Sequence, residues 1–385
     1  MNGRSPHFIV MTPGMGGADG IAALSRLVVR ALPTPDLTPT PVQVVSLSGA
    51  VRPEACNAGA ARVAFFGAGG SKARFVTCAL RAGRQAVRGT WVICLHLHQV
   101  PVALPLLWRG ARLMTVLCGI EAWKPLSVTQ RRAFLRSDIV LTISEHTAQR
   151  FREANPRLAT RVLRVCHLGV PESAVAGTAQ AAPLRGNAQP APLRGNAQPA
   201  ALIVGRMAVE ERYKGHDLLL EIWPRVISQV PEARLLVAGE GDDLSRLEAR
   251  GAQLGLREQV TFLGRVSEQA LATLYQGCTF FVMPSRNEGF GLVFLEAMRA
   301  GKACIGGAGA AAEIIQDGVT GFVVNPGQPE QVLAAVLRLF REPETRERMG
   351  RAGAQRFQHE FTEECFQRRF RRLLGFQTGE APCVA

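Results

Sequence analysis

The feature that most constrains the fold is the alternation of short apolar runs with stretches of helical periodicity along the 385 residues. Apolar runs bounded by glycine and polar residues predict buried strands, and apolar residues at helical spacing predict helices between them. Strands that alternate with helices form a parallel sheet covered by helices on both faces. The first half predicts strands at residues 7–12, 43–47, 91–95, 113–117 and 139–143, and a helix at residues 21–32.

The alternation stops near residue 180 and resumes at Ala201. A chain of this length exceeds one ordinary core. We therefore expect two doubly wound α/β domains, with ligands bound at the carboxyl ends of the strands. The second half predicts strands at residues 202–206, 234–238, 260–263, 279–283 and 303–305, and helices at residues 217–229, 245–254, 268–275 and 329–340.

A tandem repeat lies where the alternation stops. Residues 182–190 recur without change as residues 191–199, and the unit is rich in Pro, Gly, Ala and polar residues. Two copies cannot build a solenoid, so we interpret the repeat as a disordered linker without a catalytic role. With a terminal helix expected at residues 355–376, the predicted limits are 1–175 for the first domain, 176–200 for the linker, 201–354 for the second domain and 355–385 for the C-terminal segment.

The net charge of +14 calls for an anionic partner. Nucleic acid is disfavoured because aromatic residues make up only 6% and no DNA- or RNA-binding motif accompanies the charge. An anionic membrane surface fits better, although an ordinary solvated helix face explains the pattern as well. On helical geometry the segment 71–90 presents Arg74, Arg81, Arg84 and Arg88 on one side and Phe75, Ala79, Ala82 and Ala86 on another.

Composition sets the expected compartment. The content of 47% hydrophobic and 20% charged residues indicates a folded globular protein. No apolar run reaches the length of a membrane span and the first residues do not form a secretory signal, so we expect a cytoplasmic protein. The nine cysteines are scattered without a Cys-x-x-Cys pair, which favours reduced thiols over disulfides or a zinc site.

Glu288 and Glu296 stand eight positions apart in a glycine-flanked turn that runs into an apolar helix. The first glutamate is expected in the turn after a buried strand, and the second about two turns along the helix. Gly289 and Gly291 allow a ligand to approach the backbone, and amides at a helix start attract anionic oxygens. A sugar nucleotide offers both hydroxyls for carboxylates and a diphosphate for amides.

Two cations are expected at the same edge of the second sheet. Arg206 follows a predicted strand, and Lys214 opens the next helical stretch. Arginine presents a planar fork to phosphate oxygens and lysine a compact charge, so the two together could balance a diphosphate. We favour this interpretation over solvated surface charge. Asp242 and Asp243 precede a predicted helix, where we expect capping rather than metal binding.

Seven short segments occur in order along the second half: residues 205–206, 214–215, 237–241, 262–264, 284–286, 288–296 and 318–322. In order and spacing, residues 201–350 resemble the donor domain of retaining glycosyltransferases of the GT-B fold, family four. That group holds many sugar transferases of bacterial exopolysaccharide, capsule and lipopolysaccharide. The resemblance implies two Rossmann-like domains with an interdomain cleft, a UDP- or GDP-sugar donor, no metal and no cofactor.

The resemblance also implies roles for particular residues. Glu288 would contact the donor sugar, with Arg206 and Lys214 stabilising the departing diphosphate. Glu296 would hold the ribose hydroxyls. The terminal helix would cross back to the first domain. The other donor-binding positions implied are Gly205, Arg265, Val266, Gly289, Phe290, Gly291 and Leu292.

The glycine-rich loop after the first strand does not fit a dinucleotide site. Gly14 and Gly16 are followed by Asp19 where the third glycine of that fingerprint belongs. The resemblance assigns Gly16 and Gly17 instead to a loop beside the donor phosphate and the acceptor. Asp19 is a weaker candidate for an acceptor or sugar contact.

Further candidates for an acceptor or sugar contact lie at later strand ends. His96 and His98 end a strand, where a structural hydrogen-bonded histidine is an equal alternative. Cys118 stands where the resembled family usually has a histidine, and Glu121 follows in the same segment. A nucleophilic Cys118 is disfavoured because no base partner is identifiable.

We therefore expect a retaining hexose transferase that acts on a lipid-linked or polysaccharide acceptor at the inner face of the plasma membrane, in bacterial surface polysaccharide synthesis. Two alternatives stay open. One is a sugar-nucleotide epimerase or hydrolase, and the other, motivated by Cys118, is a non-catalytic sugar-nucleotide-binding partner.

Overall fold

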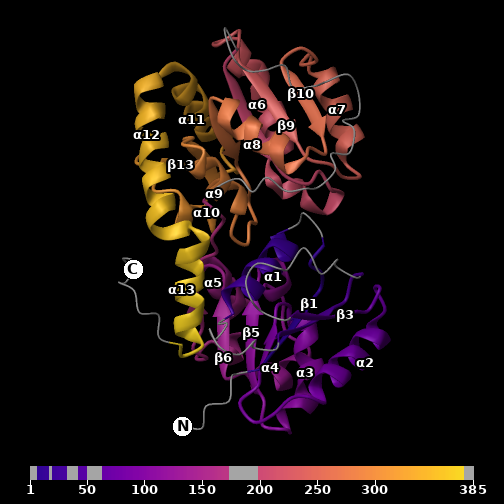
Figure 1. The fold of residues 1–385 in the computed structure, drawn as a ribbon. Helices are drawn as coiled ribbons and strands as arrows, with labels where there is room; N and C mark the ends of the chain where they lie inside the picture. Colours follow the sequence, from indigo (N-terminus) through magenta and orange to yellow (C-terminus); the bar gives the residue numbers. More distant parts are fainter. Residues whose placement is uncertain (1–6, 17–19, 33–41, 50–62, 173–197, 377–385) are drawn as a thin grey trace. The chain divides into compact units, whose positions relative to one another are not determined.

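The computed structural model describes residues 7–16, 20–32, 42–49, 63–172 and 198–376 (Figure 1). The tandem repeat therefore lies almost wholly outside the described residues. The chain forms two compact units. The first takes the residues up to Gly169 together with the segment from Glu363, and the second runs from Val170 to Thr362. The predicted domain limits at 175, 200 and 354 stay predictions beside this division.

The first unit is built on a seven-stranded sheet with the order β3-β2-β1-β4-β5-β6-β7, parallel throughout. Every residue of β1 and β4 is buried. Because consecutive residues of a strand point to opposite faces, both faces of the sheet are covered there. The strands are β1 (Phe8–Thr12), β2 (Val42–Ser46), β3 (Val63–Gly67), β4 (Trp91–Cys94), β5 (Arg112–Leu117), β6 (Ile139–Thr142) and β7 (Arg164–Val165).

The C-terminal helix packs within the first unit, against α1 (Figure 1). The Arg30 guanidinium holds the Glu363 carboxylate through two hydrogen bonds, and Arg371 Nε donates to the Ala31 carbonyl at 2.9 Å. These contacts fix α13 to a helix that lies far away in sequence. The helices are α1 (Gly20–Ala31), α2 (Lys72–Gly83), α3 (Val100–Leu107), α4 (Val128–Phe134), α5 (Glu145–Ala154) and α13 (Glu363–Leu373).

The second unit has a six-stranded parallel sheet with the order β10-β9-β8-β11-β12-β13. The strands are β8 (Ala200–Val204), β9 (Arg234–Ala238), β10 (Val260–Gly264), β11 (Phe280–Met283), β12 (Cys304–Gly307) and β13 (Gly321–Val324). The helices are α6 (His216–Ile227), α7 (Leu244–Gln253), α8 (Glu268–Gly277), α9 (Leu292–Arg299), α10 (Ala311–Ile314), α11 (Pro329–Arg341) and α12 (Pro343–Arg356).

Both sheets confirm the predicted doubly wound architecture, and each reverses its strand order at one point. The reversal lies between β1 and β4 in the first sheet, and between β8 and β11 in the second. Loops that leave neighbouring strands at such a point diverge to opposite faces, which opens a crevice at the carboxyl edge. The loops after these four strands are therefore the first places to search for a site.

Two predicted helices are shorter in the structure. The helix expected over residues 71–90 ends at Gly83. The helix expected over residues 355–376 is interrupted at Thr362, which has extended backbone angles of φ −70° and ψ 159°. Thr362 forms a β-bridge with Val170, and this pairing cannot form inside a continuous helix. Within the described residues, no helix is both long enough and apolar enough to cross a bilayer.

Candidate functional site

The loops after β8 and β11 meet at the reversal point of the second sheet. The backbone N–H of Arg286 donates to the Tyr213 carbonyl at 3.0 Å, which joins the two loops. Gly215 has a φ of 96°, and a Cβ at this position would lie 2.8 Å from the Pro284 carbonyl oxygen. Only glycine permits this approach. The segment carrying Lys214 is therefore docked on the turn that leads to Glu288.

Arg206 and Lys214 share one carboxylate, that of Glu211. Arg206 Nη2 donates to Glu211 Oε1, and Lys214 Nζ lies 3.4 Å from Glu211 Oε2. The Arg206 side chain is 65% exposed, whereas those of Lys214 and Glu211 are 15% and 12% exposed. The structure thus brings the two predicted cations together. Sequence analysis missed Glu211, which looked like one more charge in a polar segment.

Glu288 lies beside this charged group. Among the described residues, its buried Oε2 atom has no hydrogen-bond partner. Burial raises the pKa of Glu288 above its ordinary value, the Lys214 charge opposes that rise, and the Glu211 charge adds to it. Lys214 is therefore close enough to influence two carboxylates. The arrangement leaves one carboxylate oxygen of Glu288 available for a ligand.

Glu296 lies further along α9 and has a different environment. The hydroxyl of Tyr275, a residue that is only 2% exposed, donates to Glu296 Oε2 at 2.9 Å. Burial raises the pKa of Glu296, while the hydrogen bond from Tyr275 and the charge of Arg299 oppose the rise. Tyr275 therefore fixes the orientation of the carboxylate. The sequence gave no signal for Tyr275, which comes from α8.

The residues between the two glutamates start α9. Gly291 is the N-cap residue, with a φ of 99° in the left-handed region, and Leu292 is the first helical residue. The Phe290 ring is 2% exposed and lies 6.4 Å from the Phe361 ring. Because that side chain is buried, only the backbone of Phe290 is placed to meet a ligand. Gly289 is partly buried in the same turn.

Arg265 and Val266 follow β10, two strands away from β8 in the sheet. The Arg265 side chain is 67% exposed, and its Nη1 lies 3.4 Å from Glu240 Oε1. The structure does not bring these residues into contact with Glu288. Arg265 and Val266 lie further along the same carboxyl edge of the sheet. Gly205, directly after β8, packs against the Lys214 side chain.

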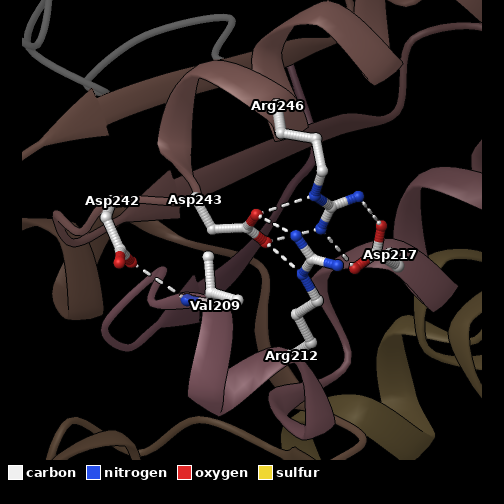
Figure 2. Close-up of polar contacts among 6 residues, drawn as sticks. All are labelled: Val209, Arg212, Asp217, Asp242, Asp243 and Arg246. Carbon is white, nitrogen blue, oxygen red and sulfur yellow. Dashed lines mark hydrogen bonds and ion pairs between the residues drawn. The ribbon is translucent and has the colours of Figure 1, made fainter.

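A network of four charged residues fixes the segment that precedes Lys214 (Figure 2). Asp243 is 3% exposed and accepts hydrogen bonds from Arg212 at 3.0 and 2.7 Å and from Arg246 at 2.8 and 2.6 Å. Arg246 also holds Asp217, at 2.6 and 2.8 Å. Hydrogen bonds from Arg246 and Arg212 hold the pKa of Asp243 well below its usual range. Asp243 is therefore ionised at neutral pH.

The expected capping by Asp242 and Asp243 was wrong. Asp243 occupies the N-cap position of α7, but its side chain does not cap the helix. It binds the two guanidinium groups instead, because charged donors form stronger hydrogen bonds with a carboxylate than amides do. Asp242 Oδ1 accepts from the backbone N–H of Val209 at 3.0 Å (Figure 2).

The candidates of the first unit lie after β1, β4 and β5. Gly16 is exposed and follows β1, whereas Gly17 and Asp19 lie outside the described residues. His96 Nδ1 accepts from the backbone N–H of His98 at 3.2 Å. Burial, with the charge of His98, lowers the pKa of His96 to about 4, so this ring is neutral at pH 7.

Cys118 has the environment of a structural thiol. Its Sγ donates to the Leu95 carbonyl at 3.1 Å, and its backbone N–H donates to Glu121 Oε1 at 2.7 Å. Burial and then the Glu121 charge raise the pKa of the Cys118 thiol well above its ordinary value. Burial also raises the pKa of Glu121. A neutral thiol is a poor nucleophile, which agrees with the sequence-based expectation.

A cavity of about 490 Å³ borders the same two loops of the second unit. Its walls include Tyr213, Gly215, Pro284 and Arg286, but neither Lys214 nor Glu288. The cavity is therefore lined by neighbours of the charged group and not by the charged group itself. In the described part of the chain, no group of three or more His, Cys, Asp or Glu side chains is arranged to hold a metal ion.

Comparison with known proteins finds similarities that are strongest in the second unit. Residues 188–356 match the family model described as glycosyl transferases group 1. Alpha-D-kanosaminyltransferase of Streptomyces kanamyceticus is 30% identical over 227 residues, which cover 58% of this chain and 57% of that protein. A GDP-mannose-dependent phosphatidylinositol monomannoside mannosyltransferase of Corynebacterium glutamicum is 31% identical over 168 residues, covering 42% of this chain and 44% of that protein. The chain thus spans about half the length of the curated relatives that it matches.

Solved structures match nearly the whole chain. HepE of Anabaena, crystallised with UDP and glucose, superimposes with a TM-score of 0.73 over 96% of this chain and 99% of that chain, at 18% identity. At this identity the likeness establishes the fold. The chain therefore has the two parallel-sheet units of the GT-B fold, and residues 188–356 are similar to the glycosyl transferases group 1 family.

Proposed function

We propose that the chain is a glycosyltransferase that moves a hexose from a nucleoside diphosphate sugar to an acceptor. The observation that carries the proposal is the meeting of Arg206, Lys214 and Glu288 at the reversal point of the second sheet. A diphosphate would lie against the two cations, and the hexose would face the Glu288 oxygen that has no hydrogen-bond partner among the described residues. Glu296, held by Tyr275, would receive the ribose hydroxyls.

The costly event in such a transfer is the loss of a nucleoside diphosphate from an oxocarbenium-like sugar. Charge gathers on the leaving phosphate, where fixed cations and helix-start amides stabilise it. Arg206, Lys214 and the backbone from Gly289 to Leu292 supply such groups. We propose retention at the anomeric carbon and a reaction without metal. The acceptor attacks on the face that the diphosphate leaves, and its proton passes to the leaving phosphate.

The first unit would supply the acceptor side, as the family resemblance implies. Gly16, His96 and Glu121 lie at the carboxyl edge of its sheet. Because Nδ1 of the neutral His96 already accepts from His98, its Nε2–H can donate a hydrogen bond to the oxygen of an acceptor hydroxyl. Cys118 replaces the usual histidine of the family and offers only a weak donor, already directed at Leu95. We propose that the backbone of this segment replaces the missing imidazole.

The donor base is either uracil or guanine. The mannosyltransferase relative is GDP-mannose-dependent by name, and the HepE structure contains UDP and glucose. The relatives named as glycosyltransferases favour transfer over epimerisation or hydrolysis of the sugar nucleotide. We propose a lipid-linked or polysaccharide acceptor at the cytoplasmic face of the plasma membrane, as in bacterial surface polysaccharide synthesis.

The test is an assay of purified protein with labelled UDP-hexoses and GDP-mannose in the presence of membrane extract. We expect label in a lipid or polysaccharide fraction, and a loss of roughly a hundredfold in rate for Glu288→Gln. Glu330→Gln is the control, because Glu330 pairs with Arg225 on the exposed surface of the same unit. Full transfer by Glu288→Gln contradicts the site. An epimerised nucleotide sugar supports the epimerase, and binding without turnover supports a non-catalytic partner.

A further inference from the structure

Glu211 is a largely buried acidic residue in the proposed diphosphate site. We propose that Glu211 is a resident counter-anion, which occupies Arg206 and Lys214 when the site is empty and competes with the diphosphate for them. The inference rests on the proposed function and deepens it. It assigns to Glu211 the control of how tightly a nucleoside diphosphate is held.

The contacts of Glu211 match those expected of a diphosphate. Its two carboxylate oxygens are divided between the two cations, Oε1 with Arg206 and Oε2 with Lys214. A diphosphate bound at this pair would likewise divide its oxygens between a guanidinium and an ammonium group. The Glu211 side chain is 12% exposed, so water screens its charge only weakly. A diphosphate on the same two cations would therefore meet an anion already in place.

Lys214 is also close to a second carboxylate. The charges of Lys214 and Glu211 act in opposite directions on the ionisation of Glu288. Two carboxylates and two cations thus nearly balance each other in the empty site. When a diphosphate binds, the net charge of the site becomes negative. Each carboxylate then repels the diphosphate and lowers the affinity for it. Of the two, Glu211 has the direct contacts with both cations.

The backbone around Glu211 is held in place, so exchange must occur through side chains. Arg212, the next residue, is tied to Asp243, and the N–H of Val209 is tied to Asp242 (Figure 2). Lys214 is fixed on the other side by the docking of Gly215 on Pro284. Arg206 is different, since its side chain is 65% exposed. It can turn from Glu211 to a phosphate without movement of the chain.

A competing anion has a use in a transfer reaction. Two cations that bound the diphosphate without opposition would also retain the product after transfer, and product release sets the turnover of many enzymes. Glu211 forms its ion pairs with Arg206 and Lys214 again when the nucleoside diphosphate leaves. Removal of its charge should therefore tighten the binding of the product and slow turnover.

The experiment measures the binding of inorganic pyrophosphate, UDP and GDP by calorimetry to the full-length wild type, Glu211→Gln and Glu210→Gln. Glutamine keeps the shape of Glu211 and removes the charge. We expect Glu211→Gln to bind pyrophosphate and the preferred nucleotide roughly fivefold more tightly. Glu210→Gln, the exposed neighbour, should match the wild type. The increase in affinity of Glu211→Gln over the wild type should become smaller as the salt concentration is raised. Misfolding cannot cause such an increase, because it only weakens binding.

The outcomes separate the inference from the proposed function. If the wild type binds a nucleoside diphosphate and Glu211→Gln binds it equally or more weakly, Glu211 is not a competitor and only this inference is overturned. If neither protein binds pyrophosphate, UDP or GDP, the proposed donor site falls and the role of Glu211 falls with it. If Glu211→Gln binds more tightly and its kcat decreases while the KM for the donor also decreases, both are supported.

Discussion

His216 shows how burial changes the chemistry of one residue. It opens α6 directly after the Lys214-Gly215 pair and is 5% exposed. Among the described residues, its buried Nε2 atom has no hydrogen-bond partner. Burial, followed by the Lys214 charge, lowers the pKa of His216 from 6.5 to about 4. The imidazole therefore stays neutral in the folded protein at pH values where the unfolded chain binds a proton.

This difference predicts a loss of stability in mild acid. Between pH 6.5 and 4 the unfolded chain holds more protons at this position than the folded chain, so the free energy of unfolding falls as the pH falls. At pH 5 the contribution is about 2 kcal/mol relative to pH 7.5. Urea unfolding at both pH values should show that His216→Gln loses less stability than the wild type. Equal losses of stability in the wild type and in His216→Gln would contradict the assignment.

The spacing of Glu288 and Glu296 and the pairing of Arg206 with Lys214 could be predicted from the sequence, because strand ends and helical periodicity place such residues locally. The partners that hold them could not. Tyr275 reaches Glu296 from 21 residues away, and only packing of α8 beside α9 makes that contact. Glu211 lies between the two predicted cations in the sequence but was not predicted, because nothing in the sequence distinguishes a shared carboxylate from a solvated one.

The Asp243 network links elements that are separate in sequence. Asp243 lies 31 residues from Arg212, and Arg246 lies 29 residues from Asp217. The network thereby ties the segment before Lys214, the start of α6 and the start of α7 to one buried carboxylate (Figure 2). Helix-capping rules apply to neighbours along the chain, which is why they gave the wrong partner for Asp243.

Removal of the Asp243 charge should loosen this part of the second unit. Asp243→Asn leaves two guanidinium groups without their shared carboxylate, and we expect a loss of about 2 kcal/mol in the free energy of unfolding. The loss is smaller than for a fully buried pair because the Arg212 and Arg246 side chains are 48% and 37% exposed. Urea unfolding at pH 7.5 measures it. Glu330→Gln, at the exposed ion pair with Arg225, should cause no measurable change, and equal effects of the two variants would contradict the role of burial.

Most strands and helices were predicted within a few residues, because buried parallel strands appear as apolar runs. Helix ends were harder to predict. The α2 helix ends at Gly83, but Ala86 is buried and stands where the apolar spacing of α2 would continue. The sequence therefore predicted a longer helix. Thr362 ends a helix through its bridge to Val170, a partner that lies 192 residues earlier, as the two residue numbers show. Such pairings exist only in the folded chain.

At the scale of the molecule, part of the excess positive charge is carried by exposed arginines of the first unit. Phe75, Ala79, Ala82 and Ala86 are buried, as expected, while Arg74, Arg81, Arg84 and Arg88 are exposed. Apolar side chains are exposed on the same segment: Val76 and Leu80 of α2 are 40% and 45% exposed. Trp108, after α3, is 84% exposed. Arg109 Nη2 donates to the Arg84 carbonyl at 3.4 Å, which brings the residue next to Trp108 to the end of α2. Basic and apolar side chains together suit an anionic membrane surface.

We predict that reversal of Arg74, Arg81, Arg84 and Arg88 to glutamate weakens sedimentation with anionic liposomes by more than about tenfold, since each basic residue near such a surface contributes about 1 kcal/mol. Trp108→Ala should weaken it to a smaller degree. The control reverses four exposed arginines of the second unit, which produces the same change in net charge. Sedimentation that depends only on net charge would contradict a defined membrane face. The control positions are Arg250, Arg257, Arg348 and Arg351.

The two ends of the segment that contains the tandem repeat are anchored on the same unit. Arg299 Nη1 donates to the Pro171 carbonyl at 2.8 Å, and Arg234 Nε donates to Gln198 Oε1. The covalent passage from the first unit to the second is complete before the repeat begins, at Gly169 and Val170. The duplicated nine-residue unit therefore stands between two points of the chain that both belong to the second unit. A change in copy number leaves the direct covalent passage at Gly169 and Val170 unchanged in length.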